Sequence, residues 1–238
     1  LQVSERAARI APEYGIDYRT PLFAIHRKGH YGGIVGRAYE NWMEYHELVR
    51  EVKERGGDFI KIMISGIMVY EQYGKMSEEP LGNEEIRELI HIAHEEGMAV
   101  MVHANGADTV RAAVLAGADS IEHGNYIDTD VLDAMKAGKT VWVPTIVTTG
   151  NLFGCGRYPQ EELQKIFDRA SRNLQYAWEN RIFMALGSDA GAYRVLHGQG
   201  IQDEYQIFCR ILGETVQLRE HLAEGESIIR RKFQEGKR

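Results

Sequence analysis

The chain has 238 residues, of which 44% are hydrophobic and 26% are charged, with a formal net charge of −7 at pH 7. This length and composition suit one barrel-sized domain with a substantial core. Because no basic stripe dominates, we expect no nucleic-acid partner. No apolar stretch approaches the roughly 20 residues that span a bilayer, so we expect no membrane association. Two cysteines, Cys155 and Cys209, cannot form a disulfide framework, which favours a reduced, cytoplasmic compartment.

Apolar spacing and glycine punctuation divide the chain into alternating helices and strands. The predicted order is helix 3–14, strand 21–25, a glycine-rich loop 26–33, helix 38–55, strand 58–66, helix 83–96, strand 98–102, helix 108–116, strand 120–121, helix 129–138, strand 140–147, helix 160–180 and strand 182–186, followed by two helices. Long polar loops follow the strands, whereas short turns follow the helices.

Six strand–helix units in strict alternation predict a parallel sheet. In a βα barrel, the loops at the C-terminal ends of the strands build the active site, which matches the loop lengths here. Six units are fewer than the usual eight, and a doubly wound open sheet is the alternative. No G-x-G-x-x-G fingerprint follows any strand, and this favours the barrel.

Lys61 lies in the middle of the apolar run 58–66. A continuous apolar run of this kind predicts a strand buried on both faces of a parallel sheet. Lysine is rarely buried without a partner, and desolvation lowers its pKa towards the neutral amine, which can react. The alternative is a lysine that extends its charge from the strand end into water.

Three more side chains of the metal-ligand type follow predicted strands: His103, His123 and Asp189. Each has a structural explanation when taken alone, such as a hydrogen-bonded histidine or a helix-capping aspartate. Together with Lys61 they lie on four separate strands, on the face where barrel enzymes place their chemistry. Two histidines and carboxylates that converge on a cleft are the ligand set expected for zinc or a similar divalent ion.

The ordered set of motifs resembles the amidohydrolase superfamily of metal-dependent hydrolases. It is most similar to the branch with imidazolonepropionase-like enzymes and Xaa-Pro or Xaa-Arg dipeptidases. The stretches that carry the resemblance are 59–63, 102–104, 120–124 and 187–191. The resemblance implies an α/β fold, a (β/α)8 TIM-like barrel of which residues 1–238 hold about six βα units. These would be strands three to eight plus C-terminal helices, without the family's N-terminal strands and flanking β-sandwich.

The resemblance also implies a role for each candidate residue. Lys61 would be carboxylated by carbon dioxide to a carbamate that bridges two divalent metal ions, with zinc the expected metal. His103 and His123 would bind the second metal. Asp189 would bind the first metal and act as general base, then pass the proton to the leaving amine. Further candidates, as substrate contacts, are His30, Arg194 and His197.

The sequence departs from the family pattern at two places. The family's first strand carries a His-x-His pair that supplies the other two metal ligands, and no His-x-His occurs here. Because the chain begins with Leu1 rather than methionine, we expect a preceding segment to supply that pair. Asn105 stands where many relatives have a second histidine, which predicts altered substrate contacts.

The leading hypothesis is an enzyme, a metal-dependent hydrolase that cleaves an amide, peptide or lactam C–N bond in a small molecule. A dipeptide or an N-acyl amino acid is the candidate substrate. One alternative is a truncated or non-catalytic barrel-derived binding module that lacks the His-x-His ligands. Another is a metal-independent lyase that forms a Schiff base on Lys61. Association into a homo-oligomer, through helices around Trp42 or Trp178, is left open.

Overall fold

Short β-branched strands pair in parallel to form an open sheet with helices between the strands. The structure, a computed structural model, describes residues 2–235. The strands are β1 (Ala24–Arg27), β2 (Gly36–Tyr39), β3 (Ile60–Met63), β4 (Val100–Ala104), β5 (Ser120–His123) and β6 (Val141–Val143). They form one six-stranded sheet in the order β2-β1-β3-β4-β5-β6, and every pairing is parallel. The predicted α/β class and parallel sheet are therefore confirmed.

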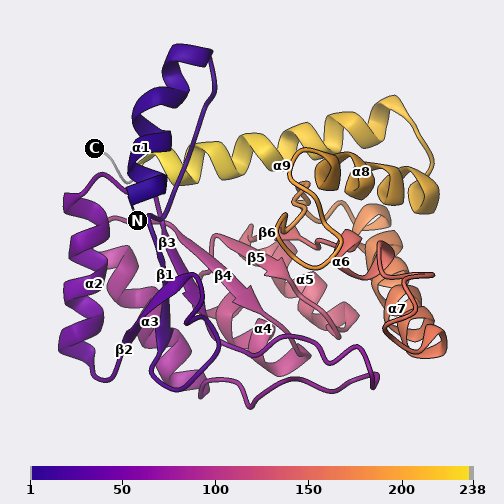
Figure 1. Cartoon of the computed structure of the whole chain (residues 1–238), viewed down its shortest axis with the longest axis horizontal. Coiled ribbons are helices and arrows are strands. Elements are labelled where there is room, and N and C mark those ends of the chain that lie inside the picture. Colours follow the sequence, from indigo (N-terminus) through magenta and orange to yellow (C-terminus); the bar gives the residue numbers. More distant parts are fainter. Residues whose placement is uncertain (1, 236–238) are drawn as a thin grey trace.

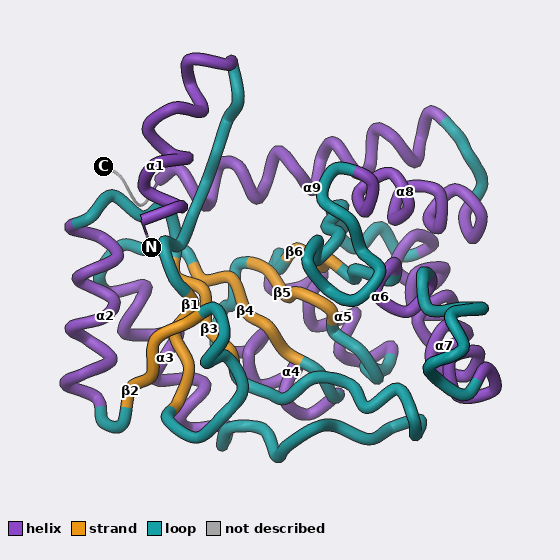
Figure 2. Tube along the Cα trace, in the orientation of Figure 1, coloured by secondary structure: helices purple, strands orange, loops and turns teal. Residues whose placement is uncertain are grey.

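From β2 onward a helix connects each strand to the next, whereas β1 and β2 are joined by a loop, and further helices extend beyond the sheet (Figure 1). They are α1 (Gln2–Ile10), the 3-10 turn η1 (Ala11–Tyr14), α2 (Trp42–Glu54), α3 (Asn83–Glu95), α4 (Ala107–Leu115), α5 (Thr129–Gly138), α6 (Val147–Gly150), α7 (Gln160–Glu179), α8 (Gln199–Leu212) and α9 (Val216–Glu235). Between β3 and α3 the chain makes a long loop (teal in Figure 2). None of the helices described in residues 2–235 is both long enough and apolar enough to cross a membrane.

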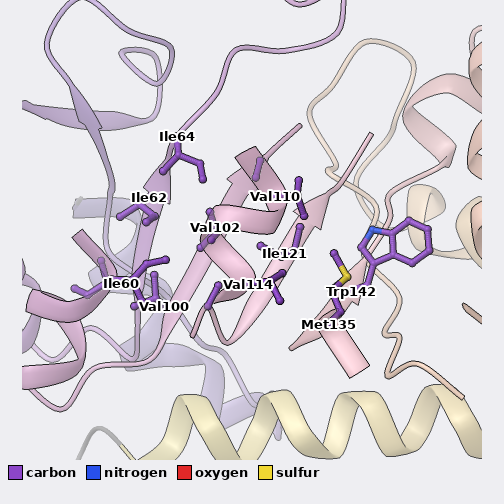
Figure 3. Packing of buried hydrophobic residues seen from close by; sticks show 14 of the residues in the cluster. Ile60, Ile62, Ile64, Val100, Val102, Val110, Val114, Ile121, Met135 and Trp142 are labelled. Carbon is purple, nitrogen blue, oxygen red and sulfur yellow. The ribbon is translucent and has the colours of Figure 1, made fainter. Parts of the chain in front are cut away.

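The main core lies between the sheet and the helices that follow its strands. Figure 3 shows strand residues of this core, such as Ile62, Val102 and Ile121, packed in one cluster. Helical residues of the same cluster include Val110 and Met135. Members of this cluster include Ile60, Ile62, Val100, Val102, Val110, Val114, Ile121, Met135 and Trp142, all exposed by 3% or less. Each such side chain contributes about 2 kcal/mol of burial energy. The helices therefore cover one face of the sheet, and the candidate functional residues lie on the other face.

The opposite, inner face of the sheet carries the candidate functional residues in two levels. The register pairs Lys61 with Met101 and pairs Met101 with Ser120. One pair further along, His103 lies opposite both Met63 and Glu122. Because alternate strand residues point to opposite faces, these residues all project to the inner side, away from the isoleucine core. Lys61 therefore lies one level below His103.

Helix α9 covers the N-terminal end of this inner face (Figure 1). Its Phe233 stacks on Phe59, just before β3, with ring centroids 4.5 Å apart. Its Ile228 packs in a cluster with Val141 and Val143 of β6. Near its start, buried His221 donates from Nε2 to the Ile182 carbonyl at 2.8 Å. The inner face is therefore closed at one end and open at the C-terminal ends of the strands.

Strand β2 was not predicted from the sequence, because the expected helix 38–55 began too early. The segment Gly36–Tyr39 instead pairs along β1, and the helix starts at Trp42 after Asn41, whose side chain accepts from the Glu44 N–H. A Cβ at Gly36 would lie 2.6 Å from the Ala24 carbonyl oxygen. The close parallel pairing therefore requires glycine here, a tertiary contact that local spacing does not reveal.

Two predicted strands were also wrong in extent. The strand expected over 182–186 is reduced to a single parallel bridge between Met184 and Trp142, with one backbone hydrogen bond on each side. The strand expected over 140–147 stops at Val143, because Pro144 has no N–H and Thr145 adopts φ 50°. Residues 147–150 form the short helix α6 instead.

Replacing Gly225 by alanine tests how α9 is seated. A Cβ at this position would lie 1.9 Å from the Met184 carbonyl oxygen, so α9 must shift. We expect Gly225→Ala to lower the free energy of unfolding by about 2–4 kcal/mol, despite the roughly 1 kcal/mol that alanine adds to helix propensity. The measurement is urea denaturation beside Ser227→Ala, an exposed site on the same helix. Equal stability of the two variants would contradict the close contact.

Candidate active site

A cavity of roughly 970 Å³ opens at the C-terminal ends of the strands. Four of the predicted residues line it together: Lys61, His103, His123 and Asp189. They come from β3, from the ends of β4 and β5, and from the segment after the Met184 bridge. The structure thus brings these four residues together around one cavity. Asp189 is the most exposed of them, whereas His103 is 3% exposed.

His103 is oriented by the loop that follows β3. Its Nε2 lies 3.2 Å from the carbonyl oxygen of buried Gly66, and a carbonyl can only accept, so Nε2 carries the proton. The same carbonyl accepts from the Asn105 side-chain nitrogen at 3.1 Å. This arrangement leaves Nδ1 of His103 as the nitrogen with a lone pair for a ligand. Asn105 thus supports the loop that holds His103.

His123 is held by residues of β6 and the turn that follows it. Its backbone adopts φ 67°, and its carbonyl accepts from the Trp142 indole N–H at 2.9 Å. Its Nδ1 lies 2.6 Å from the Thr145 hydroxyl oxygen. A proton on Nδ1 donated to Thr145 leaves Nε2 free for a ligand, which is the usual way that an outer hydrogen bond fixes a metal-binding histidine. The rings of His103 and His123 are 4.7 Å apart.

Burial keeps both imidazoles neutral at pH 7. It lowers the pKa of His103 well below the ordinary value, with His123 and Lys61 adding to the effect. It also lowers the pKa of His123 to about 3, with a further contribution from Lys61. Neutral imidazole is the form that binds metal ions. The pair is therefore in the protonation state that a metal site needs.

Lys61 is a cation in a place that disfavours its charge. Burial lowers the pKa of Lys61, and the carboxylates of Glu122 and Asp189 oppose that shift. Burial raises the pKa of Glu122, opposed by Lys61 and by the hydroxyl of Ser120, which donates to Glu122 at 2.8 Å. Lys61 is therefore more readily converted to the neutral amine than a surface lysine.

The donor set fits a metal ion only in part. His103 and His123 offer one free nitrogen each from neighbouring strands. Within residues 2–235, no group of three or more His, Cys, Asp or Glu side chains is close enough to hold a metal ion. The histidine pair therefore needs another ligand, and Lys61 and Asp189 are the other predicted ligands that line the same cavity.

The structure brings only one of the three predicted substrate contacts to the cavity. His30 lines it, with Nδ1 3.4 Å from a Glu78 carboxylate oxygen. Arg194 and His197 are exposed and are not part of the cavity lining. The Arg194 carbonyl accepts from the Asn151 side chain at 3.1 Å, which ties the segment to the loop after α6.

Glu204 of α8 is a buried supporting residue that no sequence pattern singles out. It is 0% exposed, and its two carboxylate oxygens accept from the backbone N–H groups of Ile146 and Val147, at 3.0 and 2.6 Å. Those residues directly follow Thr145, the partner of His123. Burial raises the pKa of Glu204 to about 8, although the two hydrogen bonds oppose the shift. An acidic residue in a predicted amphipathic helix carries no local mark of such burial.

The open parallel sheet, with its cavity at the C-terminal ends of the strands, defines an α/β protein of the barrel class. A family model described as the Amidohydrolase family matches residues 39–211, which is most of the chain. The chain belongs to the amidohydrolase family.

Curated relatives resemble the chain over part of its length. An uncharacterized protein of Mycobacterium tuberculosis is 29% identical over 170 residues, covering 68% of this chain and 44% of the relative. Ochratoxinase of Aspergillus niger is 29% identical over 157 residues, covering 61% of this chain and 31% of the relative. The chain thus matches less than half the length of these relatives.

Solved structures confirm the predicted fold, a partial TIM-like barrel, over the doubly wound alternative. The structure of A. niger ochratoxinase matches with a TM-score of 0.75 and 20% identity, covering 95% of this chain and 58% of that one. A Xaa-Pro dipeptidase matches with a TM-score of 0.61 and 23% identity, covering 86% and 56%. A prolidase complexed with N-methylphosphonate-L-proline matches with a TM-score of 0.63 and 25% identity, covering 82% and 49%.

Replacing Glu204 by glutamine tests the buried carboxyl group. Its folded-state pKa of about 8 lies above its ordinary 4.5, so the folded form binds the proton more tightly than the unfolded form. The contribution of Glu204 to stability is therefore greatest below pH 4.5 and is lost as pH rises towards 8. We expect the unfolding free energy of the natural chain to fall by up to about 4 kcal/mol more between pH 5 and 8.5 than that of Glu204→Gln. Urea titrations at both pH values measure this difference, and parallel pH dependences would contradict it.

Proposed function

We propose that residues 1–238 are the part of a metal-dependent amidohydrolase barrel that holds strands three to eight and the C-terminal helices. We further propose that the enzyme hydrolyses an amide, peptide or lactam C–N bond in a small molecule. The observation that carries this proposal is the shared cavity of Lys61, His103, His123 and Asp189, with both imidazoles neutral. Membership of the amidohydrolase family supports hydrolysis as the reaction class.

Lys61 would complete the ligand set as a carbamate. The ammonium group would first lose one proton. The neutral amine would then attack carbon dioxide, forming an N–C bond and releasing a second proton, so that the cation becomes an anion. The residues that would hold the metal ion are then the carbamate of Lys61, His103 through Nδ1 and His123 through Nε2. A divalent ion, zinc being the expected one, supplies an activated water and polarises the substrate carbonyl when it is bound.

Asp189 would act as the general base and then as the general acid. Its carboxylate lines the cavity and is open to solvent, so it can approach a water molecule that attacks the carbonyl carbon. It would accept the proton of that water and deliver it to the nitrogen as the C–N bond breaks. The products are a carboxylate and an amine. Thr145 and Gly66 would hold the two histidines in orientation throughout.

A second candidate is a barrel-derived binding module without catalysis. It is favoured by one observation, that residues 2–235 contain no group of three His, Cys, Asp or Glu side chains able to hold a metal ion. Such a module would still bind a small molecule in the cavity.

Asp189→Asn separates these two functions. In the full-length natural protein, purified with zinc in the medium, we expect kcat towards glycyl-L-phenylalanine or another responsive dipeptide or N-acyl amino acid to fall about 10³-fold. Asp130→Asn, at an exposed position on α5, is the matched control and should leave kcat unchanged. We expect the metal content, measured in parallel, to be about one or two ions per protein chain. Lys61→Met should lower this content.

Two results would count against the hydrolase. Full activity of the metal-free protein would refute metal dependence. Absence of turnover across a panel of dipeptides and N-acyl amino acids, with ligand binding retained, would favour the binding module.

A further inference from the structure

Arg157 is held between two aromatic rings at the rim of the cavity. Its guanidinium carbon lies 5.1 Å from the ring centroid of Tyr158 and 4.8 Å from that of Tyr193. Both tyrosines line the cavity, whereas Arg157 is exposed in the loop before α7. Two cation–π contacts restrict the planar guanidinium and lower the entropy that it loses when it binds a ligand. We call Tyr158, Arg157 and Tyr193 the arginine clamp.

Apart from these two cation–π contacts, the guanidinium of Arg157 has no partner within the described part of the chain. Among the described residues, the side-chain contacts of Arg157 are the two tyrosine rings, and none is an ion pair with a carboxylate. Arg55, by contrast, pairs with the carboxylates of Glu5 and Glu51. The guanidinium therefore keeps its N–H donors for a ligand, and its fork geometry suits a carboxylate.

Aromatic surface extends from the arginine clamp into the cavity. The Tyr70 ring lies 5.3 Å from the Tyr158 ring, and the Tyr70 hydroxyl donates to the Thr148 carbonyl at 3.3 Å. At the histidine pair, the Tyr31 ring lies 5.0 Å from His103. Rings held in this way give a large apolar contact at low entropic cost. The cavity, at roughly 970 Å³, has room for a ligand of dipeptide size.

Acidic residues also line the cavity, and they could attract a cationic ligand in place of the carboxylate that Arg157 would bind. Glu78 is already engaged, by the Tyr31 backbone N–H at 2.8 Å and by His30 at 3.4 Å. Glu71 is exposed and lines the cavity as well. A ligand with an ammonium group could use Glu71, so an experiment must compare both charges.

We propose that Arg157 binds the free carboxylate of the substrate, whose aromatic side chain packs on Tyr70 and Tyr158. The substrate class is then an N-acyl aromatic amino acid, or a dipeptide with a C-terminal aromatic residue. This inference rests on the proposed hydrolase function, because it concerns the same cavity. It makes Arg157 a determinant of specificity that acts on the substrate and not on the reacting bond.

Calorimetric binding to the full-length Asp189→Asn protein, purified with zinc, tests the arginine clamp without requiring turnover. The probes share one aromatic amide core. N-acetyl-L-phenylalanine carries a carboxylate, N-acetyl-2-phenylethylamine is neutral, and glycyl-2-phenylethylamine is a cation. We expect the carboxylate probe to bind most tightly. Adding Arg157→Met should weaken its binding about ten- to hundredfold and leave the neutral probe within about twofold.

Two further variants make the comparison specific. Arg172→Met removes the charge of an exposed arginine on α7, outside the cavity lining, and should leave all three affinities unchanged. Arg157→Lys keeps the charge but loses the planar fork, and it should bind the carboxylate probe with intermediate affinity.

The outcomes distinguish this inference from the proposed function. Equal weakening of all probes by Arg157→Met, no weakening, no binding of the carboxylate probe, or a preference for the cationic probe would each overturn the role of Arg157. Selective weakening would support it, even if the protein without the Asp189 substitution failed to hydrolyse any probe. That failure would count against the hydrolase alone.

Discussion

The site depends on one constraint, a lysine placed on the inner face of a parallel sheet where its positive charge is disfavoured. The strand that carries Lys61 buries its isoleucines on the other face, so the side chain cannot turn away without dismantling the core. Two carboxylates offset part of the cost. Two nearby histidines stay neutral in response to burial and to the lysine. Carboxylation in the presence of a divalent ion would replace an unfavourable cation with a bound anion.

The histidine pair is positioned by groups that lie far from it in sequence. Trp142 of β6 and Thr145 of the turn that follows it hold His123, and Gly66 of the loop after β3 holds His103. Glu204 then fixes the turn that contains Thr145 through two backbone hydrogen bonds from a helix that comes almost 60 residues later. The geometry of the pair therefore depends on the C-terminal helices as well as on the strands.

Sequence patterns predicted the residues at strand ends well, because the carboxyl ends of parallel strands meet at one edge. His103 and His123 could be placed in this way, whereas Lys61 was placed by the apolar strand that surrounds it. The patterns could not predict β2, which requires Gly36 to approach the Ala24 carbonyl, or the burial of Glu204, since both are set by tertiary contacts. His197 could not be placed either, because glycine-rich loops are not fixed by periodicity.

The most direct measurement is a crystal structure of the full-length protein with zinc, with anomalous diffraction at the zinc edge. The account predicts an anomalous peak between Nδ1 of His103 and Nε2 of His123, and electron density for a carboxyl group on the Lys61 amine. Zinc bound away from both histidines, or an unmodified Lys61 paired with Glu122 beside an occupied metal site, would contradict it.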